Sequence, residues 1–177
     1  MTKEEVRSFS LARLDLKNAK TLVDIGAGTG SVVIEACVCY PELQAIAIEK
    51  NPDAVELIGQ NREKFSIQNL TVIKGVAPDD LPVCQADAVF IGGSGGYLNK
   101  SIEWSAQNLV TGGRLVLNFI LLNNLIDALG LIQKHSFVQI EVTQLQASRL
   151  CNLGEGFYFK PANPVYVVSC IKGKTEK

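Results

Sequence analysis

A glycine-rich turn directly after a short apolar stretch is the feature that most constrains how this chain can fold. Residues 21–31 read Thr-Leu-Val-Asp-Ile-Gly-Ala-Gly-Thr-Gly-Ser, and we interpret 22–25 as a buried strand and Ser31 as the start of a helix. Because glycine has no side chain, the backbone can turn sharply there and a ligand can approach it closely. A strand that leads through such a turn into a helix N-terminus is typical of nucleotide-binding α/β proteins.

Two acidic residues sharpen this interpretation. Asp24 lies inside the predicted strand, where an apolar residue would be expected. A second predicted strand, 45–48, is followed by Glu49, roughly 20 residues beyond the glycines, where a ribose-binding carboxylate belongs. The third glycine comes one residue too early for the dinucleotide motif G-x-G-x-x-G. A tight turn without a ligand is the alternative, but it gives no reason for an acid at this distance.

The form Asp-x-Gly-x-Gly-x-Gly resembles the first motif of class I S-adenosylmethionine (SAM)-dependent methyltransferases. In that family the turn packs against the methionine part of SAM, and the acid after the second strand binds the ribose hydroxyls. The resemblance therefore assigns SAM binding to one group of residues: Asp24, Gly26, Ala27, Gly28, Thr29, Gly30 and Glu49.

Apolar periodicity predicts an alternation of strands and helices along the whole chain. We expect helices at 2–14, 31–40, 51–64, 97–110 and 121–135 and strands at 22–25, 44–49, 70–74, 86–91, 114–119, 137–146 and 165–171. The alternating pattern of 137–146 indicates a half-exposed strand near an edge, and 147–163, with its glycines and prolines, is expected to be a loop. The alternation predicts one α/β domain, residues 1–177, with a Rossmann-like, seven-stranded, mostly parallel sheet and helices on both faces. The methyltransferase resemblance adds an antiparallel last strand.

Composition excludes several classes of protein. The 17 basic and 18 acidic residues form no basic stripe, so nucleic acid is not expected as a partner. The charged N-terminus has no secretory signal, and the longest apolar run, 115–122, is too short to span a membrane. The five cysteines lack metal-ligand spacing, so we expect reduced thiols in a cytoplasmic protein and no metal site.

Ligands of open α/β sheets bind outside the carboxyl ends of the strands. That rule selects five predicted loops: 26–30, 49–51, 75–79, 92–96 and 118–120. The third is expected to lie against the adenine, with the small Ala77 beside the flat ring. Most class I methyltransferases bond the adenine amino group through an acid near the position of Val76, so Asp79 or a backbone carbonyl would have to substitute here.

Five segments occurring in order make the resemblance more specific: 1–7, 24–30, 75–78, 90–96 and 163–165. Together they resemble the decarboxylating precorrin-6B C-15 methyltransferases of cobalamin biosynthesis, and the run Ile-Gly-Gly-Ser-Gly-Gly at 91–96 is the most specific part. That family methylates carbon 15 of a corrin precursor and removes carbon dioxide from the ring C acetate, either as a free-standing protein acting on the cobalt-containing intermediate or as half of a larger enzyme.

The family resemblance has further implications. It adds Thr2, Ala77 and Gly92 to the SAM site, places residues 1–14 over the bound SAM and implies a homotetramer. The corrinoid tetrapyrrole substrate carries many carboxylates, which favour cationic partners. We therefore expect Arg149 to contact it. The glycine cluster would let the large, flat substrate come close to the methyl group, and its backbone N–H groups could bind a carboxylate, so we also expect contacts with Gly93, Ser94 and Gly95.

Catalytic residues are hard to identify, because methyl transfer to carbon needs positioning more than a strong base. The candidates for contacting or protonating the substrate are Arg149, Glu155 and Tyr158, whereas His135 lies at the opposite end of the sheet and is expected to be structural. Three alternatives remain: a SAM methyltransferase of RNA or another small molecule, a non-catalytic SAM-fold subunit, and a dinucleotide oxidoreductase.

Overall fold

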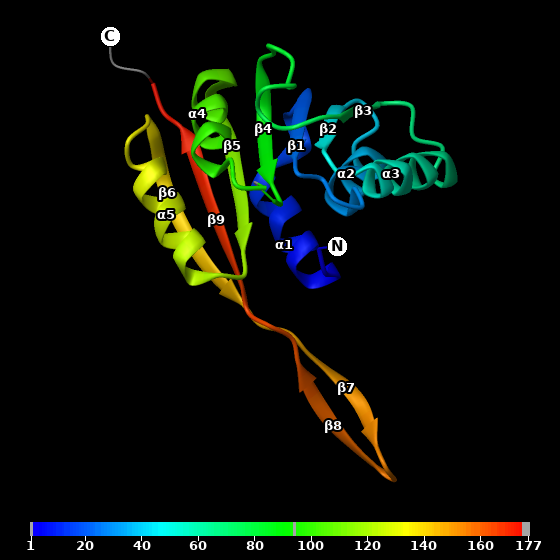
Figure 1. The fold of residues 1–177 in the computed structure, drawn as a ribbon. Coiled ribbons are helices and arrows are strands. Elements are labelled where there is room, and N and C mark those ends of the chain that lie inside the picture. Colours follow the sequence, from blue (N-terminus) through cyan, green and yellow to red (C-terminus); the bar gives the residue numbers. More distant parts are fainter. Residues whose placement is uncertain (1, 94, 175–177) are drawn as a thin grey trace.

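The computed structural model describes residues 2–93 and 95–174, which form a layered α/β fold (Figure 1). The helices are α1 (Glu4–Leu14), α2 (Ser31–Cys39), α3 (Pro52–Lys64), α4 (Leu98–Asn108) and α5 (Leu122–Ile132), with a 3-10 turn, η1 (Leu16–Asn18). The strands are β1 (Thr21–Ile25), β2 (Gln44–Glu49), β3 (Leu70–Lys74), β4 (Ala86–Ile91), β5 (Leu109–Phe119), β6 (Phe137–Leu145), β7 (Ser148–Leu153), β8 (Gly156–Pro161) and β9 (Val165–Lys172).

Seven of these strands form one sheet in the order β3-β2-β1-β4-β5-β9-β6. The first five are mutually parallel, and β9 runs antiparallel between β5 and β6. The predicted α/β class, seven-stranded sheet and antiparallel last strand are confirmed, and β6 lies at the edge as its alternating sequence predicted. Because β1 and β4 are central and parallel, their carboxyl ends meet at one edge with no strand between them.

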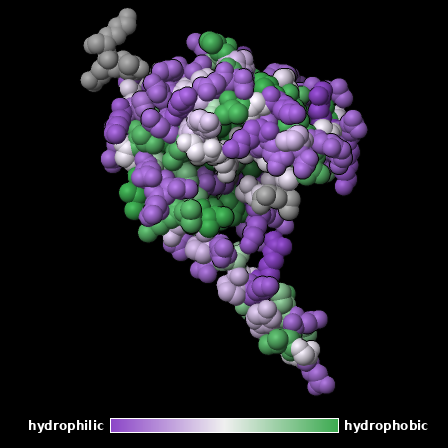
Figure 2. Space-filling view, viewed as in Figure 1, coloured by the Kyte–Doolittle hydropathy of each residue, from purple (hydrophilic) through white to green (hydrophobic). Residues whose placement is uncertain are grey.

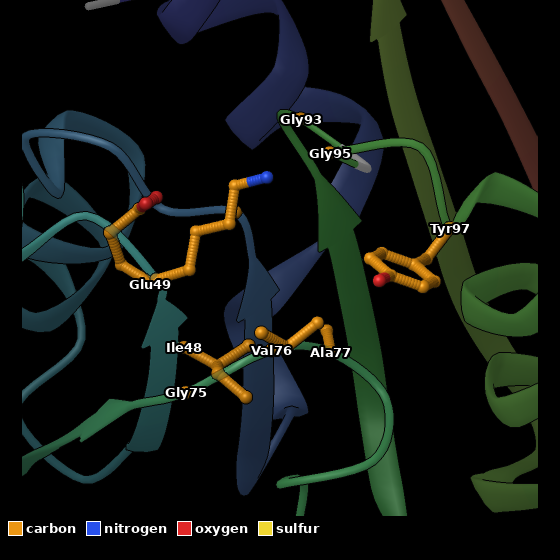
Figure 3. A pocket seen from close by; sticks show the side chains of 10 residues that line it. Ile48, Glu49, Gly75, Val76, Ala77, Gly93, Gly95 and Tyr97 are labelled. Atoms are coloured by element: carbon orange, nitrogen blue, oxygen red, sulfur yellow. The ribbon is translucent and has the colours of Figure 1, made fainter.

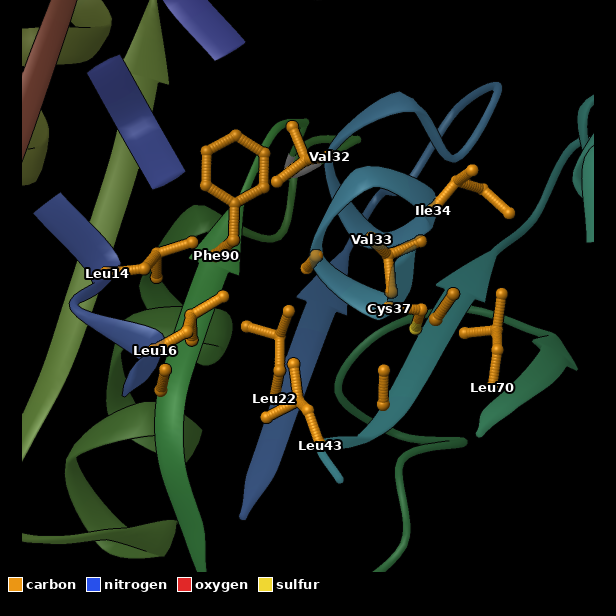
Figure 4. Close-up of a cluster of buried hydrophobic side chains, with 14 of the residues drawn as sticks. Leu14, Leu16, Leu22, Val32, Val33, Ile34, Cys37, Leu43, Leu70 and Phe90 are labelled. Atoms are coloured by element: carbon orange, nitrogen blue, oxygen red, sulfur yellow. The ribbon is translucent and has the colours of Figure 1, made fainter. Parts of the chain in front are cut away.

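Helices cover both faces of the sheet. Because successive strand residues point to opposite sides, neighbouring residues of one strand pack against different helices. Leu22 packs in a cluster with α1, α2 and α3, and its neighbour Val23 packs in a second cluster with α4 and α5. Figure 4 shows the first cluster, where Leu14, Phe90 and Val32 lie together near the glycine turn. Apolar residues of α1, α2 and α3 thus pack on this face of the sheet, and Ala27 of the glycine turn packs against the same cluster.

Helix α1 lies on the sheet through both apolar and polar contacts. Arg7 forms an ion pair with Glu35 of α2, and Asn118 Nδ2 of β5 donates to Ser10 Oγ at 3.0 Å. Ser10 and Leu14 are fully buried. The N-terminal segment is thus attached to α2 and to β5 near its carboxyl end.

The prediction of a loop at 147–163 is wrong. Strands β7 and β8 form an antiparallel hairpin there, which projects away from the sheet (Figure 1). We call residues 148–161 the hairpin arm. Gly154, at φ +59°, forms its turn, so the glycines that suggested a loop instead close a hairpin. Leu150, Phe157 and Phe159 are 58%, 72% and 67% exposed, and Figure 2 shows the arm extending beyond the body with hydrophobic side chains on its surface.

Strand β5 also departs from expectation. It begins at Leu109 rather than at residue 114 and runs through the predicted turn 111–113, with an irregularity in its pairing to β4 between Ala86 and Ala88. The strand gains length at the end opposite the ligand loops, so this difference leaves the candidate site unchanged.

Candidate functional site

A cleft runs along the carboxyl ends of β1, β2 and β4, where two cavities meet at Gly26. The first, of about 230 Å³ (Figure 3), is lined by Gly26, Ile48, Glu49, Lys50, Gly75, Val76, Ala77, Gly93, Gly95 and Tyr97. The second, of about 390 Å³, is lined by Thr2, Lys3, Val6, Gly26, Ala27, Gly28, Val32, Phe90, Gly92, Asn118, Phe119, Ile120, Asn163 and Val165. All five loops selected by the strand-end rule contribute to these two cavities.

The glycine turn is held by backbone hydrogen bonds to its neighbours. The N–H groups of Gly26 and Ala27 donate to the carbonyl of Ile48 at 3.0 and 3.2 Å, and Gly92 N–H donates to the carbonyl of Ile25 at 3.1 Å. Gly26 has φ +67°, and a Cβ built there would lie 1.9 Å from the carbonyl oxygen of Gly93. Only glycine fits at residue 26, because the loops after β1 and β4 touch there through their backbones.

Glu49 presents a fixed carboxylate at the edge of the first cavity. Its Oε2 accepts from Gly28 N–H at 2.9 Å and its Oε1 from Asn51 N–H at 2.9 Å. The residue is only 9% exposed. A carboxylate offers about four acceptor positions, so further hydrogen bonds remain available to a ligand in the cavity. The two hydrogen bonds hold the carboxylate in one orientation and leave acceptor positions on both oxygens for a ligand.

The loop after β3 and the ring of Tyr97 both line the first cavity, and Ala77 lies on the side of the loop toward the ring (Figure 3). Val76 and Ala77 give an apolar surface, and the Val76 N–H donates to the Asp80 carboxylate at 2.8 Å. Asp79 does not line the cavity and instead pairs with Lys100 at 3.5 Å. The chemistry of these walls suits a flat ring, and the acid proposed to bond its amino group is directed elsewhere.

Asp24 lies beneath the glycine turn, on the sheet face that α2 covers, and lines neither cavity. It is 1% exposed, and neither carboxylate oxygen has a hydrogen-bond partner within the described residues. Burial raises the pKa of Asp24 to about 7; the nearby Val33 N–H opposes this rise without reaching hydrogen-bond geometry, and the charge of Glu49 adds to it. The Asp24 carboxyl therefore keeps its proton to a much higher pH than an exposed aspartate does.

Several other predicted site residues lie outside the cleft. Thr29 and Gly30 sit behind it, with Gly30 packed against Ile58. Glu155 is at the tip of the hairpin arm and Tyr158 is on β8, and neither lines the two cavities. Ser94 falls outside the described residues.

Arg149 lines a third cavity, of about 460 Å³, which lies between α1 and the base of the hairpin arm. His135 follows α5, and it lines none of the three cavities.

Sequence reasoning did not assign several of the lining side chains to the site, among them three that are large or charged. Lys50 follows Glu49 directly, Tyr97 follows the second glycine cluster, and Phe90 precedes it. Their positions beside the selected loops were the available signal.

Two further findings concern what the described residues lack. No helix among them combines the length and the apolar character that crossing a membrane requires. Across 2–93 and 95–174, no three His, Cys, Asp or Glu side chains gather as a metal site.

Comparison with known proteins places this geometry in a family. The precorrin methyltransferase domain family matches residues 1–172. A cobalt-precorrin-6B C(15)-methyltransferase (decarboxylating) of Salmonella typhimurium is 48% identical over 172 residues, covering 97% of this chain and 89% of that protein. The crystal structure of a precorrin-6y C5,15-methyltransferase from Geobacter metallireducens superposes with a TM-score of 0.89 at 37% identity, covering 97% of this chain and 91% of that one.

A more distant structure shows the fold alone. A SAM-dependent O-methyltransferase of Thermotoga maritima has a TM-score of 0.82 at 20% identity, covering 100% of this chain and 68% of that one. The fold is that of class I SAM-dependent methyltransferases. With the family match spanning nearly the whole sequence and a relative of 48% identity, the chain belongs to the precorrin methyltransferase family.

Proposed function

We propose that this chain uses SAM to methylate precorrin-6B, or its cobalt-containing form, at C-15 and removes the ring C acetate carboxyl group as carbon dioxide. The names of the Salmonella and Geobacter relatives support this assignment. The observation that carries the use of SAM is the fixed Glu49 carboxylate beside Gly28, because it offers acceptors for two neighbouring hydroxyls at the edge of the first cavity.

The residues of the cleft fit SAM. Glu49 would bind the ribose, Ala77 and Tyr97 would enclose the adenine, and the turn at Gly26 would contact the methionine part. The buried carboxyl of Asp24 would support that turn from beneath, with Thr29 and Gly30 shaping it. SAM supplies the methyl group, and the chain's own residues orient it and exclude water.

The second cavity is the proposed place for the macrocycle. Phe90, Phe119 and Ile120 give it apolar walls, and Gly92 lets a flat substrate approach the turn closely. Gly93 and Gly95 follow Gly92 in the same loop and line the first cavity, so we propose that they contact the substrate where it meets the bound SAM. Arg149 would meet the substrate carboxylates. When the bond to the carboxyl group breaks, its electron pair enters the conjugated ring system, so the step needs no further cofactor.

The test is mass spectrometry after anaerobic incubation with methyl-labelled SAM and precorrin-6B, with and without cobalt. We expect the product to gain one labelled methyl group and lose carbon dioxide, and the preferred form shows whether the metal must be present. Glu49→Gln, run in parallel, should give much less product, whereas Glu56→Gln on α3 should match the unmodified chain. SAM binding without a change in either substrate form would contradict the proposal and favour another methyl acceptor.

We also propose that the protein is a homotetramer in which the hairpin arm contacts other copies. A two-stranded hairpin is only marginally stable alone, and Leu150, Phe157 and Phe159 leave an apolar surface exposed on it. Light scattering after size-exclusion chromatography should give a tetramer that Phe159→Lys dissociates. Leu153→Lys, on the other face of the arm, is the matched control, and a monomeric unmodified chain would contradict the proposal.

Two broader expectations remain proposals. Residues 1–177 would act as one SAM-binding domain in which 1–14 cover the cofactor, and the protein would work in the cytoplasm. Thr2 and Lys3 line the same cavity as Gly26 and Gly28 of the turn that would contact the methionine part, and this supports the covering role. Cell fractionation tests the location.

A further inference from the structure

The third cavity continues the proposed substrate cavity toward the hairpin arm. Both are lined by Thr2 and Lys3, at the start of α1. The remaining lining residues of the third cavity are Glu4, Glu5, Arg7, Ala147, Arg149, Cys151, Lys160, Pro161 and Ala162. A ligand wider than the second cavity would therefore extend between α1 and the base of the arm.

Cationic side chains converge on this third cavity. Arg149 of β7 lies directly opposite Lys160 of β8, so both project from the same face of the hairpin. Like charges directly opposite in a two-stranded sheet repel each other unless an anion lies between them. Lys3 and Lys160 have no carboxylate within ion-pair distance among the described residues, whereas Arg7 is already paired with Glu35.

Glu5 supplies the one carboxylate that Arg149 contacts. Its Oε1 accepts from Arg149 Nε at 3.2 Å and from Nη2 at 2.7 Å, so two donors of the guanidinium fork meet one oxygen. Arg149 also lowers the pKa of Glu5, so Glu5 is charged at neutral pH. Both side chains are well exposed, at 64% for Arg149 and 39% for Glu5. An exposed pair of this kind contributes little to stability, so another carboxylate can replace Glu5 at small cost.

We propose that Arg149, Lys160 and Lys3 form a binding subsite for peripheral carboxylates of the substrate, and that Glu5 is an internal carboxylate which the substrate displaces. The inference rests on the proposed function, since a tetrapyrrole bearing many carboxylates is the ligand that would reach from the second cavity into the third. The inference identifies Glu5 as a residue that weakens substrate binding. It also gives the start of α1 and the base of the hairpin arm a role in substrate selection.

Displacement predicts opposite effects for the two partners of one ion pair. The probe is uroporphyrin I, a flat octacarboxylate tetrapyrrole, titrated by fluorescence against the intact protein in the presence of SAM. Glu5→Gln removes the competitor and should tighten binding about three- to fivefold, because an exposed pair sets the scale of the competition. Arg149→Ala with Lys160→Ala should weaken binding at least about tenfold, because charge-assisted contacts to carboxylates are lost.

Two controls separate displacement from a change in net charge. Glu63→Gln on α3 removes the same charge far from the cavity and should leave affinity unchanged, and Glu5→Asp keeps the carboxylate and should stay close to the unmodified protein. A tetracarboxylate porphyrin, coproporphyrin I, should show a smaller gain from Glu5→Gln. The inference is overturned if Glu5→Gln and Glu63→Gln behave alike, or if the double alanine variant binds the probe normally.

Failure of the inference and failure of the proposed function give different results. If the variants leave probe affinity and the KM for precorrin-6B unchanged while the unmodified chain still methylates precorrin-6B, only the inference fails. If the charge-dependent effects on the probe appear but precorrin-6B is not methylated, the carboxylate subsite stands and the proposed substrate is wrong. In the active case, Glu5→Gln should lower KM with kcat unchanged, which a purely structural role for Glu5 would not produce.

Discussion

The glycine-turn cleft and the hairpin arm are built in contrasting ways. In the cleft, Gly26 is held by a hydrogen bond to the end of β2 and Glu49 by hydrogen bonds from Gly28 and Asn51, and the strands beneath them are buried. Along the arm, two six-residue strands pair only with each other and nearly every residue is exposed. The cleft is positioned by the core beneath it, whereas the arm has no core of its own.

This difference indicates where each region's specificity comes from. A cleft fixed by backbone contacts presents the same groups to any ligand, which suits a cofactor. An exposed arm with one apolar face and one cationic face depends on other molecules for its contacts. The contrast therefore predicts that changes in the cleft act on cofactor binding and stability together, while changes in the arm act on assembly and substrate alone.

The largest expected effect is at Gly26. Gly26→Ala places a methyl group 1.9 Å from the carbonyl oxygen of Gly93, so the two loops must separate. We expect SAM to bind at least about 100-fold more weakly by calorimetry, equivalent to about 3 kcal/mol. Gly28→Ala is the control, because it has a similar positive φ but no atom within 4 Å of the new methyl group. Equal SAM affinities in the two variants would show that the loop contact is unimportant.

Glu49→Gln also tests SAM binding in the cleft, with a smaller expected effect than Gly26→Ala. The amide keeps the shape of the side chain but removes the charge that strengthens hydrogen bonds to ligand hydroxyls, a change worth about 2 kcal/mol. SAM should bind about 30-fold more weakly, and the melting temperature should fall as well, because the amide NH2 group cannot accept the hydrogen bond that Glu49 now accepts from Gly28 or Asn51. Glu56→Gln, exposed on α3, should have no effect on binding. A fall in stability without a loss of affinity would assign Glu49 to the fold instead.

Asp24→Asn should alter how stability depends on pH. Burial raises the Asp24 pKa from 3.8 to about 7 in the folded protein, so between these values the folded state holds a proton that the unfolded chain has released. Stability is therefore lost as pH rises toward 7. Relative to Asp24→Asn, the unmodified chain should lose about 3 kcal/mol between pH 5 and pH 8, measured by urea unfolding. Parallel pH profiles for the two proteins would contradict the assignment.

The smallest effect on the cleft is expected from removing the arm. Ala162 N–H donates to the carbonyl of Ala147 at 2.8 Å, so a two-glycine turn can replace residues 148–161 without moving β6 or β9. SAM affinity should stay within about twofold, as for surface changes away from a site, while the tetramer is lost. A large drop in SAM affinity would show that the cleft depends on the arm and that the two regions are not independent.

Much of the fold could be predicted because the relevant signals are local. The apolar run 22–25 indicates a strand, the glycines after it indicate a sharp turn, and Glu49 marks the end of the next strand. Each of these signals is contained within a few neighbouring residues. The parallel sheet then follows from alternation of strands and helices, and the strand-end rule brings five loops to one edge. These steps need no knowledge of which side chains meet.

The hairpin arm could not be predicted in the same way. Its glycines and prolines are equally compatible with a loop, and its strands lack a buried face that would impose a clear pattern on the sequence. Asp24 illustrates a second limit, because its position in the strand is visible in the sequence but its isolation from hydrogen-bond partners depends on α2 covering it.

The sequence by itself determined the glycine turn, the Glu49 carboxylate and the order of strands and helices, because these depend on neighbours in the chain. Only the tertiary structure decided that Val76 faces the cavity while Asp79 pairs away from it, and that Glu5 meets Arg149 across most of the chain's length. Such contacts arise when distant segments pack together, and the identities of single residues carry too little information to specify them.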